Sequence, residues 1–597
     1  LTYTPKDSVF ERKHLNRIPY PTIEQTCEKY LNTVQVLAEN NKEWENTKEA
    51  VKEFIENDGQ ILQKDLEALN KEATTSYIEG FWDTMYMELR DPVMINVSPW
   101  GLYKDDERRQ NQVERAASIM YSVARFAKKL EKGKVGDLVG MVHRGEMCVS
   151  QYAKILSSRI PQVGRDTRTY SMKYNHVHII CKGHHYVVGV MDERRKLVPE
   201  DQLIVTLEAI LKDAEKKGNA VHDIGYMTTE ERNTWAKTRN LMRQDVDNRH
   251  NFEKIDTALV TIILDNRTPK NLTNYVALTA YSLNGRHRWY DKCIQIPIYA
   301  NGKAGVILEH SPIDGDTQHG FANWVIMDAI NREPIKHSEI AYKPQYHYLT
   351  FFYTKPVRSA IRQAEVNARA LINSLDLCAY RFNEFGSSFL KTLKISPNSC
   401  LQMAFQLAYY RMHLKPGSTY EAMNMKQFYH GRTATVRTVT KETLQFTKVF
   451  FNPCSTIEEK VKALRAATSR HIKNCKESMA GFGVDRHLYI LQKLAEQRIQ
   501  RLPNLSMPKL YEDPLYARMK TDLITSSNMS GSAAVTLGGF GPTAARGFGC
   551  GYIMDPESIT LCITNYEGRA EIFLNMALQS LKDIRDVLMA HQGKNVP

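Results

Sequence analysis

The hydrophobic pattern of the 597-residue chain changes from helical to strand-like spacing along its length. Three stretches rich in Glu, Lys, Leu and Ala at helical spacing predict helices at 23–58, 61–73 and 108–132. From about residue 175, short apolar runs indicate strands that alternate with helical stretches. The expected strands are 176–181, 186–191, 258–264 and 305–310, and the expected helices between them are 201–217 and 228–245.

The same alternation returns after about residue 345. Here the expected helices are 356–376, 399–413 and 456–479, and the expected strands lie near 433–439, 535–541 and 547–553. Helices and strands that alternate on both sides of this point predict an α/β protein with two lobes. We place the N-terminal lobe at 1–350 and the C-terminal lobe at 351–597.

Composition narrows the class of protein. With 42% hydrophobic and 25% charged residues the chain is typical of globular proteins, and its ten cysteines form no CxxC pair, so neither a zinc site nor a disulfide framework is indicated. No run approaches the roughly 20 apolar residues that cross a bilayer, and the segment 133–161 carries no long apolar insert. The formal charge of +13 comes from dispersed basic residues, which favours an enzyme for anionic, phosphate-bearing substrates over a nucleic-acid binder.

His310 is the strongest candidate for chemistry. It ends an apolar run and opens a polar turn within 304–315. Imidazole titrates near neutral pH, so a positioned histidine can take a proton from an alcohol, and Asp314, four residues on, offers a carboxylate to fix its tautomer. An isolated HxxxD is more often structural, and a second match from His287 to Asp291 lacks the apolar run.

Further motifs occur in the order and spacing of one family. They are Ile18-Pro19-Tyr20-Pro21, Arg288-Trp289-Tyr290-Asp291-Lys292, Glu309-His310-Ser311, Gln406-Leu407-Ala408-Tyr409-Tyr410-Arg411 and Asp485-Arg486-His487-Leu488. With them the chain resembles the carnitine/choline acyltransferases over almost its full length. The resemblance implies two chloramphenicol-acetyltransferase-like α/β lobes, each a mixed sheet flanked by helices, with an active-site tunnel between them. It also implies reversible acyl transfer between CoA and carnitine.

The resemblance assigns roles to the candidate residues. It makes His310 the general base on the 3-hydroxyl of carnitine and Asp314 its carboxylate partner. Tyr420, Thr433 and Arg486 fall on the positions that bind the carboxylate of carnitine, for which the planar guanidinium fork is suited. The choline-using branch replaces the threonine and the arginine, so we expect carnitine rather than choline.

The same resemblance assigns roles to one aromatic residue and to hydroxyl residues of a triplet. Phe540 falls where the family meets the trimethylammonium group, as a cation–π contact requires, and Thr525 is expected in the carnitine site. The family carries a Ser-Thr-Ser triplet whose third residue donates to the oxyanion. Read as Ile524-Thr525-Ser526, the triplet makes Ser526 this donor. Read as Thr525-Ser526-Ser527, it restores hydroxyls throughout, and both readings remain open.

Lys391 and Lys394 fall on the segment that contacts the phosphates of CoA, although a solvated charged loop explains them equally well. Gly538 stands where acetyl-specific relatives have methionine, so with Gly539 it leaves room for medium- or long-chain acyl groups. Alternatively, these glycines only serve a turn or close packing. The alternative activity is that of a carnitine acetyltransferase, which uses short-chain acyl groups.

The resemblance implies no permanently bound cofactor and no metal, with acyl-CoA and carnitine as substrates. It implies no nucleic-acid partner and favours a monomer in the mitochondrial matrix, with the peroxisome and the cytosol left open. A non-catalytic binder of acyl-CoA or carnitine is the alternative from another class. The presence of His310, Asp314 and Ser526 together argues against it.

Overall fold

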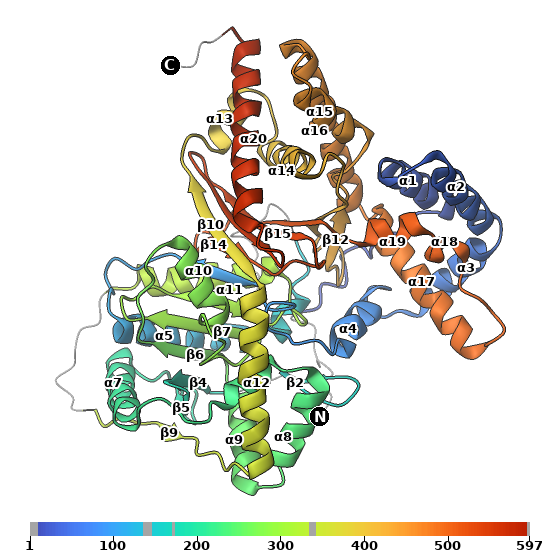
Figure 1. The fold of residues 1–597 in the computed structure, drawn as a ribbon. Helices are drawn as coiled ribbons and strands as arrows, with labels where there is room; N and C mark the ends of the chain where they lie inside the picture. Colours follow the sequence, from blue (N-terminus) through green and yellow to red (C-terminus); the bar gives the residue numbers. More distant parts are fainter. Residues whose placement is uncertain (1–9, 135–145, 170–173, 334–341, 594–597) are drawn as a thin grey trace. The chain divides into compact units, whose positions relative to one another are not determined.

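The computed structural model describes residues 10–134, 146–169, 174–333 and 342–593 (Figure 1). These residues form two compact units. Among them, unit 1 comprises residues 10–12, 83–375 and 531–541, and unit 2 comprises residues 13–82, 376–530 and 542–593. Each unit is therefore assembled from separated stretches of chain, which differs from the two contiguous lobes that the sequence predicted.

Unit 1 is built on an eight-stranded mixed sheet in the order β14-β1-β8-β7-β6-β4-β5-β9. Its strands are β1 (Trp100–Tyr103), β4 (His176–Cys181), β5 (His184–Gly189), β6 (Thr261–Asp265), β7 (Ile294–Tyr299), β8 (Gly305–Leu308), β9 (His347–Tyr348) and β14 (Val535–Gly539). β4, β6 and β7 run parallel, and the other neighbouring pairs are antiparallel. β6 and β7 are buried along their whole length, as parallel strands covered on both faces are.

Helices flank this sheet. They are α5 (Gln112–Glu131), α7 (Glu200–Lys217), α8 (Arg232–Met242), α9 (Val246–Asp256), α10 (Leu272–Tyr281), α11 (Gly315–Asn331) and α12 (Lys355–Ser374), with the 3₁₀ helices η2 (Ser150–Lys154) and η3 (Ile224–Thr229) and the hairpin of β2 (Ser158–Ile160) and β3 (Thr167–Thr169). The turn between β8 and α11 carries His310 and Asp314, so strand and helix together fix its backbone.

Unit 2 contains a six-stranded mixed sheet in the order β10-β16-β15-β13-β11-β12. Its strands are β10 (Asp376–Phe382), β11 (Thr419–Asn424), β12 (Thr433–Val436), β13 (Ile524–Asn528), β15 (Phe548–Met554) and β16 (Ile559–Asn565). Its helices are α1 (Ile23–Val34), α2 (Asn41–Glu56), α3 (Asp58–Glu72), α13 (Ser387–Thr392), α14 (Pro397–His413), α15 (Lys441–Phe451), α16 (Ile457–Met479), α17 (Val484–Arg501), α18 (Lys509–Glu512), α19 (Pro514–Lys520) and α20 (Ala570–His591), with η1 (Gln35–Leu37) after α1. α4 (Glu79–Glu88) leads the chain from unit 2 into unit 1.

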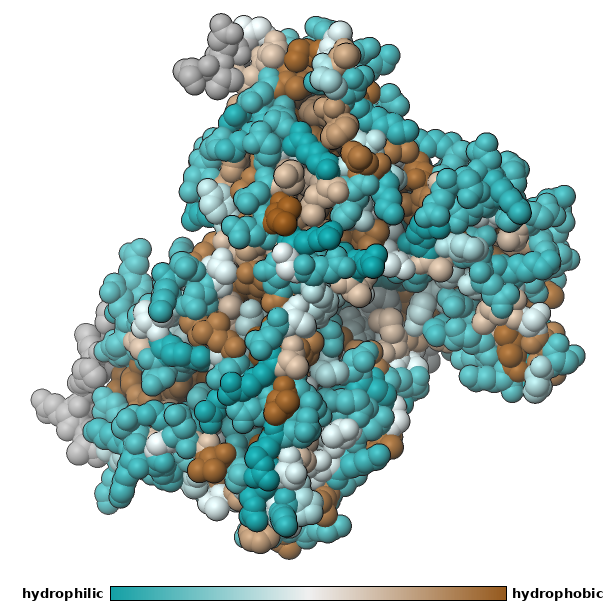
Figure 2. Space-filling model, in the orientation of Figure 1, coloured by the Kyte–Doolittle hydropathy of each residue, from teal (hydrophilic) through white to brown (hydrophobic). Residues whose placement is uncertain are grey.

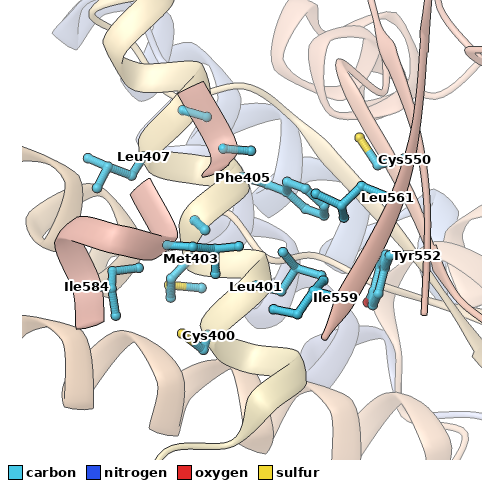
Figure 3. Packing of buried hydrophobic residues seen from close by; sticks show 14 of the residues in the cluster. Cys400, Leu401, Met403, Phe405, Leu407, Cys550, Tyr552, Ile559, Leu561 and Ile584 are labelled. Carbon is cyan, nitrogen blue, oxygen red and sulfur yellow. The ribbon is translucent and has the colours of Figure 1, made fainter. Parts of the chain in front are cut away.

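The apolar core of unit 2 lies between its sheet and the helices α14 and α20 (Figure 3). In this cluster Leu401 and Phe405 of α14 point toward Ile559 and Leu561 of β16, and Met403 of α14 lies toward Ile584 of α20 (Figure 3). Ile524 of β13 belongs to the same cluster. The face of β13 that carries Ile524 therefore points into the interior. This determines where the side chains of Ser526 and Ser527, in the same strand, can lie.

The prediction of mixed sheets flanked by helices is confirmed in both units. On the face shown in Figure 2 the surface is mostly hydrophilic, and apolar side chains form separated small patches. None of the described helices combines the length and the apolar composition needed to span a membrane. Residues 135–145, part of the segment 133–161 considered above, lie outside the described residues.

Candidate active site

His310 lies in unit 1, two residues past Leu308, the last residue of β8. Its backbone N–H donates to the carbonyl of Val97 at 3.1 Å, and the N–H of Glu309 donates to the carbonyl of Cys293 at 2.9 Å. These bonds extend the sheet pairing into the turn, so the backbone that carries the imidazole is held on both sides. The side chain itself stays 29% exposed.

The orientation of the imidazole is set through Nδ1. This atom lies 2.8 Å from the carbonyl oxygen of Ile313. Because a carbonyl oxygen only accepts, Nδ1 carries the proton, and in the neutral ring Nε2 carries the lone pair. The ring of Tyr86 packs beside the imidazole with its centroid 5.8 Å away. Nε2 is therefore the ring atom that can take a proton from a bound molecule.

Asp314 contacts the imidazole less directly than the sequence predicted. Its Oδ1 lies 4.0 Å from Nδ1 of His310, an ion-pair distance, while the hydrogen bond from Nδ1 goes to Ile313. Its Oδ2 accepts a hydrogen bond from Nε2 of Gln151 at 2.7 Å. The carbonyl thus fixes the tautomer, and the carboxylate places a negative charge 4.0 Å from Nδ1.

Glu309 belongs to a buried ionic network beneath the turn. Its carboxylate accepts from the hydroxyl of Ser311 at 2.6 Å and from Arg159 at 3.3 Å. Arg159 also pairs with Asp166 at 2.6 Å, and Asp166 pairs with Arg232 of α8 at 2.7 Å. The network ties the turn to α8, which gives Glu309 a structural role.

The glycines predicted to open an acyl channel lie in the same sheet as β8. Gly538 of β14 pairs with Gly101 of β1, and Gly101 pairs with Val306 of β8. β14 and β8 run in the same direction because both are antiparallel to β1. Phe540, just past β14, therefore emerges at the same edge of the sheet as His310. Unit 1 brings together the predicted base, the predicted aromatic contact and the glycine pair.

Unit 2 brings together three residues predicted to bind a carboxylate. Nη2 of Arg486 donates to the hydroxyls of Tyr420 and Thr433, each at 3.2 Å, and its Nε donates to the carbonyl of Thr433 at 2.8 Å. The three residues come from α17, β11 and β12, and each is half-buried. A guanidinium and two hydroxyls thus converge on one small surface, an arrangement suited to a carboxylate.

Further contacts hold Arg486 in place. Its guanidinium carbon lies 4.1 Å from the centroid of the Trp82 ring, a cation–π distance. The preceding residue, Asp485, pairs with Arg437, which also pairs with Asp522. Burial opposes the charge of Arg437, but the two carboxylates outweigh burial and raise its pKa. The first turn of α17 is thereby anchored, and Trp82 is a contributor that the sequence did not reveal.

Strand register decides which side chains of β13 share a face with this cluster. Tyr420 of β11 pairs with Thr525 of β13, and Glu421 pairs with Ser526. Side chains alternate along a strand and paired residues lie on the same face, so Thr525 and Ser527 lie on the face of Tyr420. Ser526 lies on the opposite face, together with Glu421.

The contacts of Ser526 agree with this assignment. Its Oγ accepts from Nε2 of Gln402 on α14 at 2.9 Å, and the residue is 1% exposed. Ile524, on the same face, packs into the apolar core. The hydroxyl of Ser526 thus lies in the interior of unit 2, and its role as oxyanion donor stays a prediction. The shifted reading of the triplet fits the register and makes Ser527 the candidate donor.

Lys391 and Lys394 are exposed residues of unit 2. Lys391 is in the last turn of α13, and Lys394 follows it with a positive φ of 56°. Gly386 begins the segment and approaches a neighbouring loop closely, since a Cβ there would lie 2.4 Å from the carbonyl oxygen of Pro556. The segment is thus fixed at its start and presents two cations to solvent.

Among the described residues, one group has the composition of a metal site, namely Glu421, His471 and Cys475. Nε2 of His471 lies 2.6 Å from a carboxylate oxygen of Glu421, and Nδ1 lies 2.8 Å from Oγ of Ser399. Burial opposes the charged ring, but hydrogen bonds to Cys475 and Glu421 outweigh it and raise the pKa of His471 to about 10. The short contact and the raised pKa describe a buried ion pair between His471 and Glu421.

A family model described as choline/carnitine O-acyltransferase matches residues 18–577. The mitochondrial carnitine O-palmitoyltransferase 2 of Mus musculus is 29% identical over 622 residues, which cover 98% of this chain and 92% of that protein. The same enzyme of Xenopus tropicalis is 30% identical, with 97% and 92% covered. The carnitine O-acetyltransferase of Columba livia is 29% identical over 603 residues, with 96% and 94% covered.

Proposed function

The chain belongs to the choline/carnitine O-acyltransferase family, and on this basis we propose that it transfers acyl groups reversibly between CoA and the hydroxyl of carnitine. The cluster of Tyr420, Thr433 and Arg486 carries the proposal. A guanidinium with two hydroxyls matches the carboxylate of carnitine. Choline has no carboxylate, so carnitine is the proposed acceptor.

His310 acts as the general base. Its Nε2 takes the proton of the 3-hydroxyl of carnitine as the hydroxyl oxygen attacks the carbonyl carbon of the thioester. A tetrahedral intermediate forms, its C–S bond breaks, and the departing CoA thiolate takes the proton back from Nε2. The hydrogen bond from Nδ1 to Ile313 supports this role because it leaves the lone pair on Nε2. Asp314, 4.0 Å from Nδ1, stabilises the imidazolium formed on the way.

Ser527 supplies a hydroxyl to the oxyanion of the tetrahedral intermediate. A preorganised donor of this kind lowers a barrier by about 3 kcal/mol. Thr525, on the same face of β13, adds a hydroxyl near the carboxylate of carnitine. The pairing of Thr525 with Tyr420 supports both assignments, since it puts these side chains on one face of the sheet.

Phe540 meets the trimethylammonium group of carnitine through the face of its ring. Its position at the same end of the sheet as His310, with β1 between their strands, supports this role. Lys391 and Lys394 contact the phosphates of CoA, a role that their exposure permits. The transfer proceeds between the two substrates without a permanently bound cofactor or metal.

Medium- or long-chain acyl groups are the preferred groups for transfer. Gly538 and Gly539 carry no side chains, so they leave space at this level of the sheet. The palmitoyltransferase names of two relatives agree with this preference, and the acetyltransferase name of the third keeps short chains as the alternative. The mitochondrial relatives also favour a mitochondrial location for a monomeric enzyme.

Thiol release from CoA esters of two to sixteen carbons, with carnitine or choline as acceptor, tests the proposal. Release should depend on carnitine, rise with medium or long chains and be absent with choline. His310→Ala should abolish turnover while both substrates still bind. Maximal release from acetyl-CoA would favour a carnitine acetyltransferase. Binding of both substrates without any release would favour a non-catalytic binder.

A further inference from the structure

Gln151 binds Asp314 through both ends of its amide. It lies in η2 of unit 1 and is 5% exposed. Its Nε2 donates to Oδ2 of Asp314 at 2.7 Å, while its Oε1 accepts from the backbone N–H of Asp314 at 2.8 Å and from the hydroxyl of Thr317 at 2.7 Å. One side chain thus fixes both the backbone and the carboxylate of Asp314.

Only one orientation of this amide satisfies its neighbours. The carboxylate of Asp314 accepts and needs the NH₂ group, whereas the backbone N–H of Asp314 donates and needs the oxygen. Turning the amide over would bring two acceptors together and two donors together in a buried site. The glutamine is therefore locked, and it transmits its position to Asp314.

The carboxylate of Asp314 has a competing position at the start of α11. Asp314 is the N-cap residue of this helix, and an N-cap aspartate ordinarily accepts from the N–H groups of the first turn. Here its side chain makes no such cap bond. Gln151 holds Oδ2 instead, and Oδ1 lies 4.0 Å from Nδ1 of His310. Without the amide, the cap bond is the better alternative and draws the carboxylate away from the ring.

We propose that Gln151 is a positioning residue that keeps the carboxylate of Asp314 beside His310 rather than on the N-terminus of α11. The inference rests on the proposed role of His310 as general base. Because the imidazolium forms only during proton transfer, loss of Gln151 acts on turnover more than on substrate binding.

Gln151→Leu tests this by removing the amide at similar volume. We expect kcat to fall roughly tenfold to a hundredfold with the KM values nearly unchanged, because misplacing a catalytic group by about 1 Å can cost about a hundredfold. Asp314→Asn should cause a similar loss, and the double variant should be no slower than Asp314→Asn alone. Losses that multiply in the double variant would show that Gln151 acts independently of Asp314 and would overturn the proposal.

Gln112→Leu is the matched control. Gln112 is another buried glutamine of unit 1, on α5, and its Nε2 donates to the carbonyls of Asp265 and Ile298, each at 2.7 Å. This variant also loses buried hydrogen bonds, so it should lower the melting temperature without a comparable loss of kcat. An equal loss of kcat in both variants would assign the effect of Gln151 to general destabilisation.

A crystal structure of Gln151→Leu separates this inference from the proposed function, because it requires no activity. We expect the carboxylate of Asp314 to accept from the first turn of α11 and to move away from His310. A carboxylate that stays 4.0 Å from Nδ1, as in the wild type, would overturn the proposal whatever the kinetics. If the carboxylate moves but the wild type releases no thiol with carnitine, the proposed function fails and the positioning of Asp314 by Gln151 stands.

Discussion

Separate replacement of Ser526 and Ser527 by alanine tests which face of β13 belongs to the active site. The two residues are neighbours with identical side chains, and the pairing with β11 puts them on opposite faces. Ser527 lies on the face of Tyr420, whereas Ser526 accepts from Gln402 in the interior of unit 2. The same chemical deletion should therefore cause two different kinds of loss.

The expected magnitudes follow from these surroundings. Ser527→Ala removes the proposed oxyanion donor, so kcat should fall about a hundredfold to a thousandfold, or about 3–4 kcal/mol of barrier, with little change in stability. Ser526→Ala removes an acceptor from a buried amide, which costs roughly 1–3 kcal/mol of unfolding free energy. Nε2 of Gln402 still donates to the hydroxyl of Tyr552 at 3.1 Å, so the lower end of that range is expected.

Steady-state thiol release and thermal unfolding measure the two effects on the same preparations. Thr525→Val, on the face of Ser527, is a useful comparison because it should raise the KM for carnitine more than it lowers kcat. A large loss of kcat in Ser526→Ala with near-normal kcat in Ser527→Ala would refute the face assignment. Small losses in both would remove a serine hydroxyl from the oxyanion site altogether.

Three further predictions address other parts of the structure. Arg486→Lys keeps the charge but loses the guanidinium fork, so the KM for carnitine should rise on the order of tenfold to a hundredfold, and an unchanged KM would exclude Arg486 from the site. Burial opposes the charge of His471, but contacts with Cys475 and Glu421 outweigh burial and raise its pKa from 6.5 to about 10. These contacts therefore contribute fully to stability below about pH 6.5. Their contribution is lost as the pH rises toward 10, by at most about 1.4 kcal/mol per pH unit. Urea titrations should therefore show the stability gap between wild type and His471→Gln narrowing from pH 7 to pH 9, and a constant gap would contradict the ion pair. Gly538→Met should lower the rate with palmitoyl-CoA roughly tenfold or more while sparing acetyl-CoA, whereas an unchanged chain-length profile would place the acyl chain elsewhere.

Periodicity predicted most of the elements because the burial of one face decides them. The helix expected at 399–413 is α14, Pro397–His413, and the one expected at 456–479 is α16, Ile457–Met479. The helix expected at 23–58 is broken within its pattern, because Asn40 accepts a hydrogen bond from the N–H of Glu43 and begins α2 there. Hydrophobic periodicity continues across Asn40, so it does not reveal that the capping side chain ends one helix and starts another.

Short sequence motifs contain the candidates His310 and Arg486, so both could be named from the sequence. Gln151 escaped because its partner Asp314 lies 163 residues away, and no local pattern marks the contact. The choice between Ser526 and Ser527 depends on how β13 pairs with its neighbours. A shift of one residue turns every side chain of a strand to the other face. The sequence alone therefore allowed both Ile524-Thr525-Ser526 and Thr525-Ser526-Ser527 as the triplet.

Strand β14 completes the sheet of unit 1, although it follows most of unit 2 in the chain. A ribosome that has made residues 83–375 has therefore not yet supplied the strand that pairs with β1. Until residues 535–539 emerge, the backbone of β1 presents unpaired N–H and C=O groups along that side, open to pairing with another nascent chain. The pairing of β1 is therefore complete only when β14 docks.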